Sequence, residues 1–509
     1  MTFRIAATPL STPAELPAAR QGGFPPELLD ACISAPGAEG ALRRLREPGV
    51  LVVTTGQQPA LFTGPLYSVH KALSAAALAR LLEERWERPV VPLFWSAGDD
   101  HDWAEADHAS WPTTDGAVRT VRLRERAAEA PLLPLSREPL GPEVLDAVAA
   151  FAADHATAPF GGEAVAWLRR HFHPEATVAR ASAEALAELL APAGVVCLDT
   201  THPAMKRAAA RHLVRSLGLA RDLDRDLSER ARQLAEIGHD AGVPVGDGAA
   251  LVMLEGRHGR DRLISSGDGF VTRRGREHLD LAALQRIAAA EPERLSANVL
   301  LRPVVESALL PTVAYVAGPG ELRYLELTPP IYQRLRVLQQ QPVPRWSGVV
   351  VGQSVDRVLG KFGIELGELM RPAGALESRI VRSRLASEIP DALDRLRSAV
   401  DAEYGTLARH AHDIDPTLVR MVNAMRRHAL TESERVEAKL VRHLKRRESV
   451  ELTQLARARA TVAPLGKPQE RVVTAAALLA RHGPTLVPRL LHAIRAWYAD
   501  ALEGRLVAS

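Results

Sequence analysis

The chain has 509 residues, of which 46% are hydrophobic and 25% are charged, and its formal net charge is +3. This composition suits one large domain with insertions or two to three smaller domains, and the small, evenly mixed charge does not indicate a nucleic-acid partner. The N-terminal segment lacks the apolar stretch of a signal peptide, and no run approaches the roughly 18 apolar residues that span a bilayer. We therefore expect a cytoplasmic protein without a membrane partner.

The first informative segment predicts a strand, a glycine turn and a helix. The apolar run GVLVV precedes TTGQQPALFTGPLYSVHK, Thr54–Lys71. A helix is predicted over Pro65–Arg88, because proline is tolerated at the first helical position and an apolar face follows at helical spacing. A second strand, PVVPLFW, then leads into SAGDDHDWAEADH. Polar and glycine residues thus follow two buried strands, at the edge where open α/β sheets bind ligands.

The residues after the first strand have two interpretations. Gly56, Gln57, Gln58 and Gly64 suit a cradle in which backbone amides and glutamine side chains hold an anion or hydroxyl groups. The alternative is a tight turn that needs glycine for its backbone angles.

Two residues in the first turn of that helix are further candidates. The helix N-terminus is expected to lower the pKa of His70 and keep it neutral for a catalytic role, while Lys71 could bind phosphate. The alternative for His70 is a half-buried structural histidine.

The second block holds the densest group of acids and histidines in the chain, with Glu105 and His108 at its end. We assign catalytic roles to His101, as a general base, and to Asp99, and we expect Asp100 and Asp102 to bind amine and hydroxyl groups. The flanking carboxylates are expected to favour cationic His101 and keep its pKa near neutral pH. The alternatives are a metal site and a solvated loop capped by its own aspartates. We predict no metal, because no separate His or Cys motif completes a ligand set.

Three later apolar runs are predicted as core strands: Gly194–Asp199, Thr312–Ala317 and Ser347–Val351. Insertions are expected between the strands, near 115–190, mostly helical, and near 203–300, where AALVMLEGRHGRDRLI predicts a β-hairpin. Cys197 has a strand pattern typical of a core residue, and Cys32 and Cys197, the two cysteines of the chain, have no metal-like spacing.

The strand Thr312–Ala317 is followed by GPGE, which we expect to form a second wall of the same crevice. The predicted substrate contacts there are Gly318, Gly320, Glu321 and Tyr324. Upstream, Arg302 and Glu306 are expected to support the site as an ion pair rather than contact the ligand.

From Glu377 onwards the pattern is charge-rich and helical. Apolar residues recur three and four apart, which indicates a coiled-coil seam with one stutter, at Leu393, Leu396, Val400, Tyr404, Leu407 and Ala411. Asp415 and Pro416 suit the N-cap and first residue of a second helix reaching about Ala460. Two such helices predict a hairpin arm that dimerises or packs on the core.

Four strings resemble, in order, the bacillithiol-biosynthesis cysteine-adding enzyme family: TGQQPALFTGPLYSVHK, FWSAGDDHDW, RPVVESALLPTVAYVAGPGELRY and GKPQERV. The turn before His70 and Lys71 is also distantly similar to the HIGH loop of class I aminoacyl-tRNA synthetases. The resemblance implies an α/β, Rossmann-like, nucleotidyltransferase-like parallel-sheet core with connecting-peptide insertions and a long α-helical coiled-coil hairpin that forms a homodimer.

The same resemblance implies a ligase that adds L-cysteine to the amine of glucosaminyl malate in the last step of bacillithiol biosynthesis. Amide formation from a free carboxylate is unfavourable in water, so we expect activation by ATP or ADP. Where a class I adenylating enzyme would carry a lysine-rich loop, Val349–Gly363 offers Lys361 alone. A second nucleotide site on the arm is implied near Lys439, Arg442 and Arg446, although most such basic runs are solvated helix faces.

These inferences predict three parts: a core over 1–352, a helical arm over 353–460, and helices over 461–509 that pack back on the core. Two rival functions stay open from the sequence. One is a metal-dependent hydrolase or deacetylase centred on Asp99–His108, and the other is a nucleotide-sensing dimer that signals through its arm.

Overall fold

The computed structural model describes residues 3–7, 18, 21–383, 388–447 and 449–502, the side chains of 444–447 excepted. The chain folds into two compact units. The first comprises Met1–Trp111, Arg119–Val350 and Gln469–Ser509, and the second comprises Pro112–Val118 and Val351–Pro468. No helix in the described ranges is both long and apolar enough to cross a membrane.

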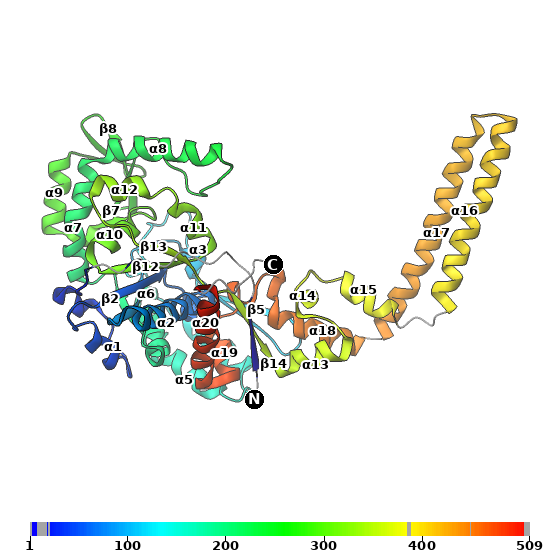
Figure 1. The fold of residues 1–509 in the computed structure, drawn as a ribbon, viewed down its shortest axis with the longest axis horizontal. Helices are drawn as coiled ribbons and strands as arrows, with labels where there is room; N and C mark the ends of the chain where they lie inside the picture. Colours follow the sequence, from blue (N-terminus) through cyan, green and yellow to red (C-terminus); the bar gives the residue numbers. More distant parts are fainter. Residues whose placement is uncertain (1–2, 8–17, 19–20, 384–387, 448, 503–509) are drawn as a thin grey trace. The chain divides into compact units, whose positions relative to one another are not determined.

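A parallel sheet forms the centre of the first unit (Figure 1). Its strands are β2 (Leu51–Gln57), β3 (Val90–Ser96), β6 (Val196–Asp199), β12 (Thr312–Ala317) and β13 (Gln341–Pro344). They lie in the order β13-β12-β2-β3-β6, all parallel. The chain therefore moves outward from β2 to β6 and then returns to β12 on the other side of β2, which makes the β2/β12 edge a topological switch point. The predicted Rossmann-like fold is confirmed.

One predicted core strand is wrong. The run Ser347–Val351 does form β14 (Gly348–Gly352), but β14 pairs with β1 (Phe3–Ala7) and not with the central sheet. The fifth strand of the central sheet is β13, which was not predicted because Pro342 and Pro344 are untypical of a strand. Proline cannot donate to a ladder and is tolerated at a sheet edge, which is where β13 lies.

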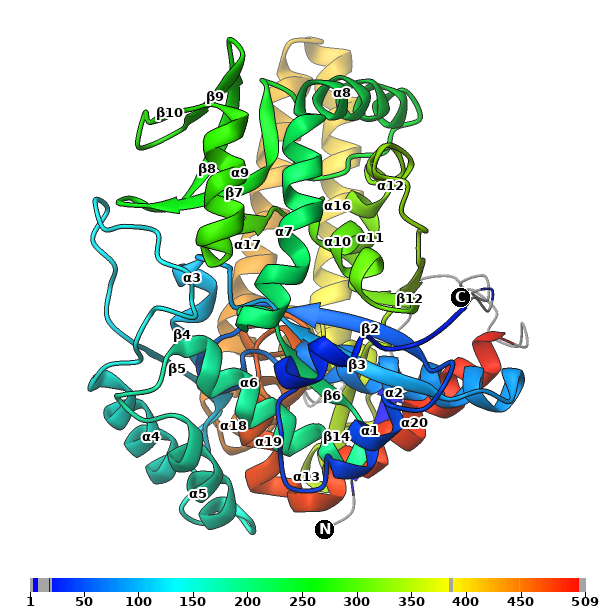
Figure 2. The ribbon, with the colours of Figure 1, turned by 90° about the vertical axis from the view of Figure 1, so that its left-hand side faces the viewer.

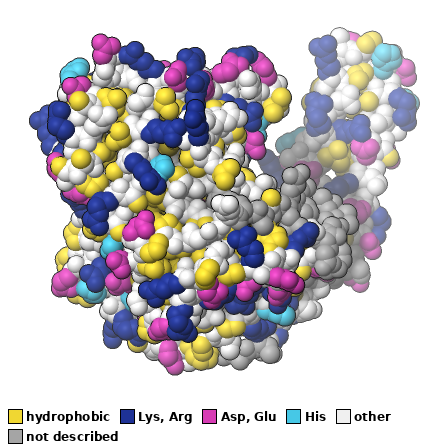
Figure 3. Space-filling view, turned by 60° about the vertical axis from the view of Figure 1, so that its left-hand side comes forward, with side chains coloured by type: hydrophobic (Ala, Val, Ile, Leu, Met, Phe, Trp, Pro, Cys, Tyr) yellow, Lys and Arg dark blue, Asp and Glu magenta, His cyan; other side chains and the backbone are white. Residues whose placement is uncertain are grey.

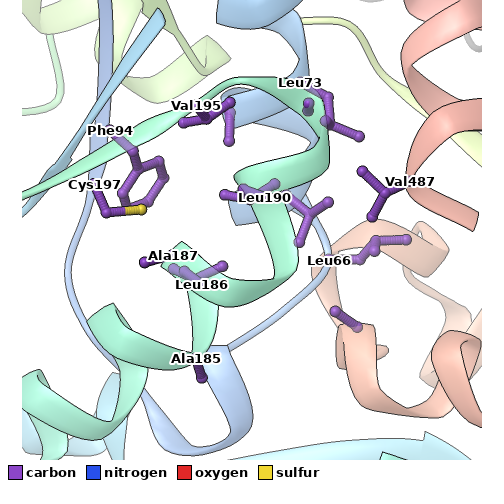
Figure 4. Packing of buried hydrophobic residues seen from close by; sticks show 14 of the residues in the cluster. Leu66, Leu73, Phe94, Ala185, Leu186, Ala187, Leu190, Val195, Cys197 and Val487 are labelled. Carbon is purple, nitrogen blue, oxygen red and sulfur yellow. The ribbon is translucent and has the colours of Figure 1, made fainter. Parts of the chain in front are cut away.

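Alternate side chains of the strands pack into two separate cores. Leu51, Val53 and Phe94 face α2 (Tyr67–Trp86), α6 (Val178–Leu190) and α20 (Leu486–Leu502). Figure 4 shows part of this cluster, in which Phe94 and Cys197 of the sheet lie near Leu190 of α6. Cys197 is buried, as its strand pattern predicted.

The opposite face of the sheet carries the second core. Val52, Leu93 and Trp95 pack with residues of α7 (Pro203–Gly218), α10 (Arg302–Leu309) and α12 (Pro329–Leu335). Figure 2 shows the sheet between these two sets of helices, so the unit has three layers. The helix α2 starts at Tyr67, close to the expected Pro65, and is buried on nearly all sides because small alanines fill its faces.

The two insertions differ in how well the sequence predicts them. Near 115–190, the strands β4 (His108–Pro112) and β5 (Val118–Arg122) precede the helices, which are α4 (Glu143–Asp154), α5 (Gly161–His171) and α6. The mostly helical prediction missed β5, a short strand without buried side chains.

The second insertion begins with α7 and α8 (Ala220–Glu236). It continues with an antiparallel sheet in the order β10-β9-β8-β7-β11 and includes the helix α9 (Leu281–Ala290). The strands are β7 (Ala249–Gly256), β8 (Gly259–Ser266), β9 (Gly269–Thr272), β10 (His278–Leu279) and β11 (Leu295–Ala297). The predicted hairpin is therefore confirmed as β7 and β8.

The second unit is helical over its described residues apart from the strand ends at its borders. Its helices are α13 (Gln353–Phe362), α14 (Leu366–Leu369), α15 (Ala375–Arg382), α16 (Glu388–Ile414), α17 (Leu418–Arg447) and α18 (Ser449–Val462). The helices α16 and α17 form the long hairpin visible in Figure 1.

The predicted coiled-coil hairpin is confirmed. Ion pairs join its two helices, Arg397 with Glu437 at 2.5 Å and Arg426 with Asp401 at 2.5 Å. At the turn, Asp415 accepts a hydrogen bond from the Thr417 amide at 2.8 Å. The second helix was predicted to reach about Ala460, and the described residues are helical to Val462, over α17 to Arg447 and over α18 from Ser449.

Candidate active site

A cavity of about 680 Å³ lies in the first unit at the carboxyl ends of the central strands. Ten of the predicted site residues line it: Gln57, Gln58, Lys71, Asp99, Asp100, His101, Gly318, Gly320, Glu321 and Tyr324. The strand order explains how they meet. Gln57 ends β2, the Asp99 loop follows β3, and Gly318 follows β12, so residues far apart in the sequence reach one edge of the sheet.

Four of the residues predicted for this crevice are not in the cavity lining. Gly56 is needed for packing, because a Cβ there would lie 2.8 Å from the Trp95 carbonyl oxygen. Gly64 is buried and has φ +71°, a backbone conformation that glycine adopts without strain. Asp102 is the N-cap of α3 (Trp103–Ala106) and accepts from the Glu105 amide at 3.2 Å. The fourth residue is His70.

His70 lies in the core and not at the cavity surface. Its side chain is fully buried, packs edge-on against Trp346, and its Nδ1 lies 2.9 Å from a Glu470 carboxylate oxygen. Its pKa is lowered, as expected, but the main cause is burial and not the helix end. The structural interpretation of His70 therefore fits its position, with more burial than the sequence suggested.

The charge around His101 differs from the sequence-based expectation. Burial lowers the pKa of His101 and Arg260 lowers it further, against the opposing effect of Asp100 and Asp102. Arg260 donates a hydrogen bond to the His101 Nδ1 at 3.3 Å, whereas the nearest Asp100 oxygen is 3.9 Å away. Asp100 and Asp102 favour the cation, as predicted, but burial and Arg260 outweigh them, so the expected near-neutral pKa is wrong. Arg260 lies far along the chain, and no local pattern places it beside His101. His101 is held neutral instead.

Buried charges converge at the cavity wall near the β2/β12 switch point. Lys71 donates to the Gly56 carbonyl at 2.8 Å and to the Gln57 Oε1 at 3.0 Å, and it forms an ion pair with Glu321. Arg302 lies 3.6 Å from Glu321. Burial alone would raise the pKa of Glu321, but Lys71 and Arg302 lower it below its usual value, so Glu321 is ionised.

Two tyrosines and a second acid complete this network. Tyr315 donates to Glu321 at 2.6 Å, and Arg302 donates to Tyr324 at 3.2 Å. Glu306 is fully buried and accepts from Thr54, and burial raises its pKa to about 7. Arg302 reaches the cavity lining while Glu306 stays beneath it. Arg302 pairs with Glu321 and not with Glu306 as predicted, so Glu306 keeps a supporting place while Arg302 faces the cavity.

Several lining residues were missed by the sequence reasoning. Lys206 of α7 donates to Asp99 at 2.7 Å, and Arg260, Arg345 and Arg471 also line the cavity. Single basic residues in an insertion, at a strand end or in a C-terminal segment carry no motif. Arg471 alone had a signal, because it lies in the GKPQERV string.

The predicted arm residues belong to the second unit. Lys439 and Arg442 are exposed on α17, and the Arg446 side chain lies outside the described residues. Lys361, near the end of α13, pairs with Glu451 at 3.1 Å within the same unit. Across the described ranges, no group of three or more His, Cys, Asp or Glu side chains is arranged to hold a metal ion.

Fold and cavity together define a Rossmann-like α/β protein with a cavity lined by charged side chains at the switch point of its sheet. Comparison with known proteins identifies the family within this class. Residues 31–345 match the family model for the bacillithiol biosynthesis BshC N-terminal Rossmann-like domain, and residues 348–497 match that of the BshC C-terminal coiled-coil domain. The chain therefore belongs to the BshC family, a family of ligase enzymes.

Curated relatives agree along most of the chain. A protein of Solibacter usitatus (strain Ellin6076) is 30% identical over 92% of this chain and 88% of its own length. Proteins of Symbiobacterium thermophilum and Bacillus licheniformis are 31% and 26% identical, each over 88% of this chain and 83% of their own length. All three bear the name "Putative cysteine ligase BshC".

Proposed function

We propose that this protein forms an amide bond between the carboxyl group of L-cysteine and the amine of glucosaminyl malate, the last step of bacillithiol synthesis. Two findings support the proposal. The family models are named for bacillithiol biosynthesis, and the relatives are named as cysteine ligases.

The observation that carries the proposal is the distribution of charge along the cavity. Asp99 and Asp100 follow β3, on one side of the switch point, and suit an amine and sugar hydroxyls. Lys71, Arg302 and Arg345 lie towards β12 and β13 and suit carboxylates or phosphates. Glucosaminyl malate carries both kinds of group, an amine and sugar at one end and a dicarboxylate at the other.

The proposed chemistry assigns the proton to His101. The substrate amine is protonated near neutral pH and must lose a proton before it attacks the cysteine carbonyl carbon. A neutral imidazole accepts that proton at Nδ1, its nitrogen without a hydrogen, where the substrate amine would take the place of Arg260, and the lowered pKa of His101 keeps the ring neutral at physiological pH. Asp99, fixed by Lys206, would hold the amine beside it.

We propose ATP or ADP as the source of activation, since the bond formed is an amide and the carboxylate oxygen must leave. A cavity of about 680 Å³ lies within the range of ordinary ligand pockets, roughly 300 to 1,000 Å³. Lys71 is the proposed phosphate contact in the cavity. Lys439, Arg442 and Arg446 of the arm are the proposed contacts of a separate nucleotide site.

We also propose that the protein is a homodimer joined through the hairpin. Large apolar side chains of α16 and α17 are exposed on the single chain, at 49 to 55%: Leu396, Leu407, Met421, Met425 and Val436. Solvated hairpins rarely keep so many exposed apolar groups, and a second copy would cover them.

The direct test is product analysis by mass spectrometry. Purified protein is incubated with L-cysteine and glucosaminyl malate, with ATP, with ADP and without nucleotide. We expect a thiol product whose mass equals that of the two substrates less one water, formed in a nucleotide-containing reaction. Absence of the product from all three reactions would reject the ligase proposal, and equal yield without nucleotide would reject the activation.

A further inference from the structure

A short C-terminal segment, Gln469–Arg471, reaches the wall of the cavity from more than 100 residues away in the sequence. The Gln469 side chain bonds both the amide and the carbonyl of Val350, at 2.9 and 3.1 Å. Glu470 is buried, and Arg471 lines the cavity. This segment therefore contributes to the site as well as to the core.

Glu470 holds Arg345 in one orientation. One carboxylate oxygen of Glu470 accepts from the Arg345 Nη2 at 2.5 Å, and the other accepts from His70 at 2.9 Å and from the Gly348 amide at 3.3 Å. The Arg345 Nη1 donates to the Trp346 carbonyl at 2.9 Å. Both terminal nitrogens are thus engaged away from the cavity.

Arg345 nevertheless lines the cavity, and its Nε lies on the side of Gly318. A Cβ built on Gly318 would lie 3.7 Å from the Arg345 Nε, 3.8 Å from the Lys71 Cε and 3.4 Å from a Glu321 oxygen. Arg345, Lys71 and the Glu321 carboxylate therefore meet around Gly318 at the cavity wall. Because Glu321 already balances Lys71, an anionic group bound at this wall would be held by Arg345.

The groups around Glu470 have defined charge states. Burial would raise the pKa of Glu470, but His70 and Arg345 lower it well below the usual range, so the carboxylate is ionised. Burial lowers the pKa of His70, so the imidazole is neutral and donates from Nδ1. Arg345 is then the cation that Glu470 balances.

We propose that Arg345 binds an anionic group of the substrate in the cavity and that Glu470 is a positioning residue that fixes the Arg345 guanidinium from behind. The inference deepens the proposed function, because the anion would be a malyl carboxylate or a nucleotide phosphate. Neither the family names nor the names of the relatives assign a role to these two residues.

Anion binding is measured by calorimetry on the full chain with two probes, L-malate and inorganic phosphate. In Glu470→Gln we expect the affinity for one of them to fall about tenfold or more, because the amide can no longer fix the guanidinium by charge. Loss for malate assigns a carboxylate site, and loss for phosphate assigns a phosphate site. This measurement needs no turnover, so it is independent of whether the ligase proposal holds.

A matched control separates positioning from general destabilisation. Glu377→Gln removes the same charge from another largely buried pair with an arginine, Glu377 with Arg459, in the second unit. We expect that variant to keep anion affinity within about twofold even if its melting temperature falls equally. If Glu470→Gln does not fold, Arg345→Lys takes its place, since lysine keeps the cation but loses the fork.

Kinetics give a second readout where product is formed. A positioning role predicts a raised KM for the anionic substrate with kcat changed much less, because uniform binding is lost. The inference is overturned if Glu470→Gln, or Arg345→Lys in its place, binds both probes like the wild type. It is also overturned if the wild type binds neither probe.

Discussion

At the scale of single residues, His101 is the side chain on which the proposed chemistry depends. It lines the cavity and is partly exposed, with 26% of its side chain accessible. Its neighbours are a carboxylate loop and the Arg260 guanidinium, so its surroundings are polar and contribute little to the core.

We expect His101→Ala to abolish product formation and to leave the fold intact. The general base is lost, whereas removal of a partly exposed side chain should change the free energy of unfolding by less than ~1 kcal/mol. Steady-state rates and thermal unfolding of the full chain check both halves. A variant that turns over within about tenfold of the wild type would show that His101 is not the base.

The pH dependence of the reaction should report the same residue. Because burial and Arg260 lower the pKa of His101 below its ordinary 6.5, the imidazole stays neutral until the pH falls below that value. The acid limb of the kcat/KM profile should therefore lie below pH 6.5.

Arg260→Gln provides the matched variant for this profile. It removes one cause of the lowering, so the acid limb should move upward towards 6.5. If the variant has a lower kcat/KM at every pH but an acid limb at the same pH, the limb reports a group other than His101.

At the scale of elements, the contact between β2 and β3 explains a glycine that the sequence suggested as a ligand contact. Gly56 pairs with Trp95, and a Cβ on Gly56 would meet the Trp95 carbonyl oxygen at 2.8 Å and its Cβ at 3.0 Å. Both strands belong to the centre of the sheet, so neither backbone can move away freely.

We expect Gly56→Ala to lower the free energy of unfolding by about 1–3 kcal/mol, a typical cost of overpacking a core. Gly320→Ala is the control, because no atom lies within 4 Å of a Cβ built there, and its melting temperature should stay the same or rise slightly. Thermal or denaturant unfolding compares the two. Equal stability of both variants would mean that the strands adjust at no cost.

At the scale of the whole molecule, the α16–α17 hairpin exposes large apolar side chains that a second copy of the chain could cover. Leu407 of α16 and Met425 of α17 are 54% and 55% exposed. Figure 3 shows a face of the molecule on which hydrophobic side chains are interspersed with charges of both signs.

We expect the wild type to sediment as a dimer and the double variant Leu407→Asp, Met425→Asp to sediment as a monomer, because carboxylates in an apolar interface lose their hydration. Leu338→Asp, at a residue 70% exposed in the first unit, is the control and should stay dimeric. Sedimentation velocity distinguishes these outcomes. A monomeric wild type, or a dimeric double variant, would contradict an interface on the hairpin.

The sequence by itself determined the local units of this protein. The strand, turn and helix of β2 and α2, the β7–β8 hairpin, the strand β12 and the α16–α17 hairpin were all predicted, because each depends on periodicity and turn residues within one segment. From the same motifs and the family resemblance, ten residues that line the cavity were predicted as site residues.

Tertiary structure alone decided how neighbouring residues divide between core and site. His70 and Lys71 are adjacent on α2, yet His70 turns to Glu470 in the core while Lys71 turns to Glu321 at the cavity. Likewise, β13 forms a strand despite its prolines because it pairs with β12 at the edge of the sheet. Arg345 is held by the carboxylate of Glu470, which lies 125 residues away in the sequence. Such choices depend on which distant groups meet on folding, and burial and long-range charge leave no local pattern in a sequence.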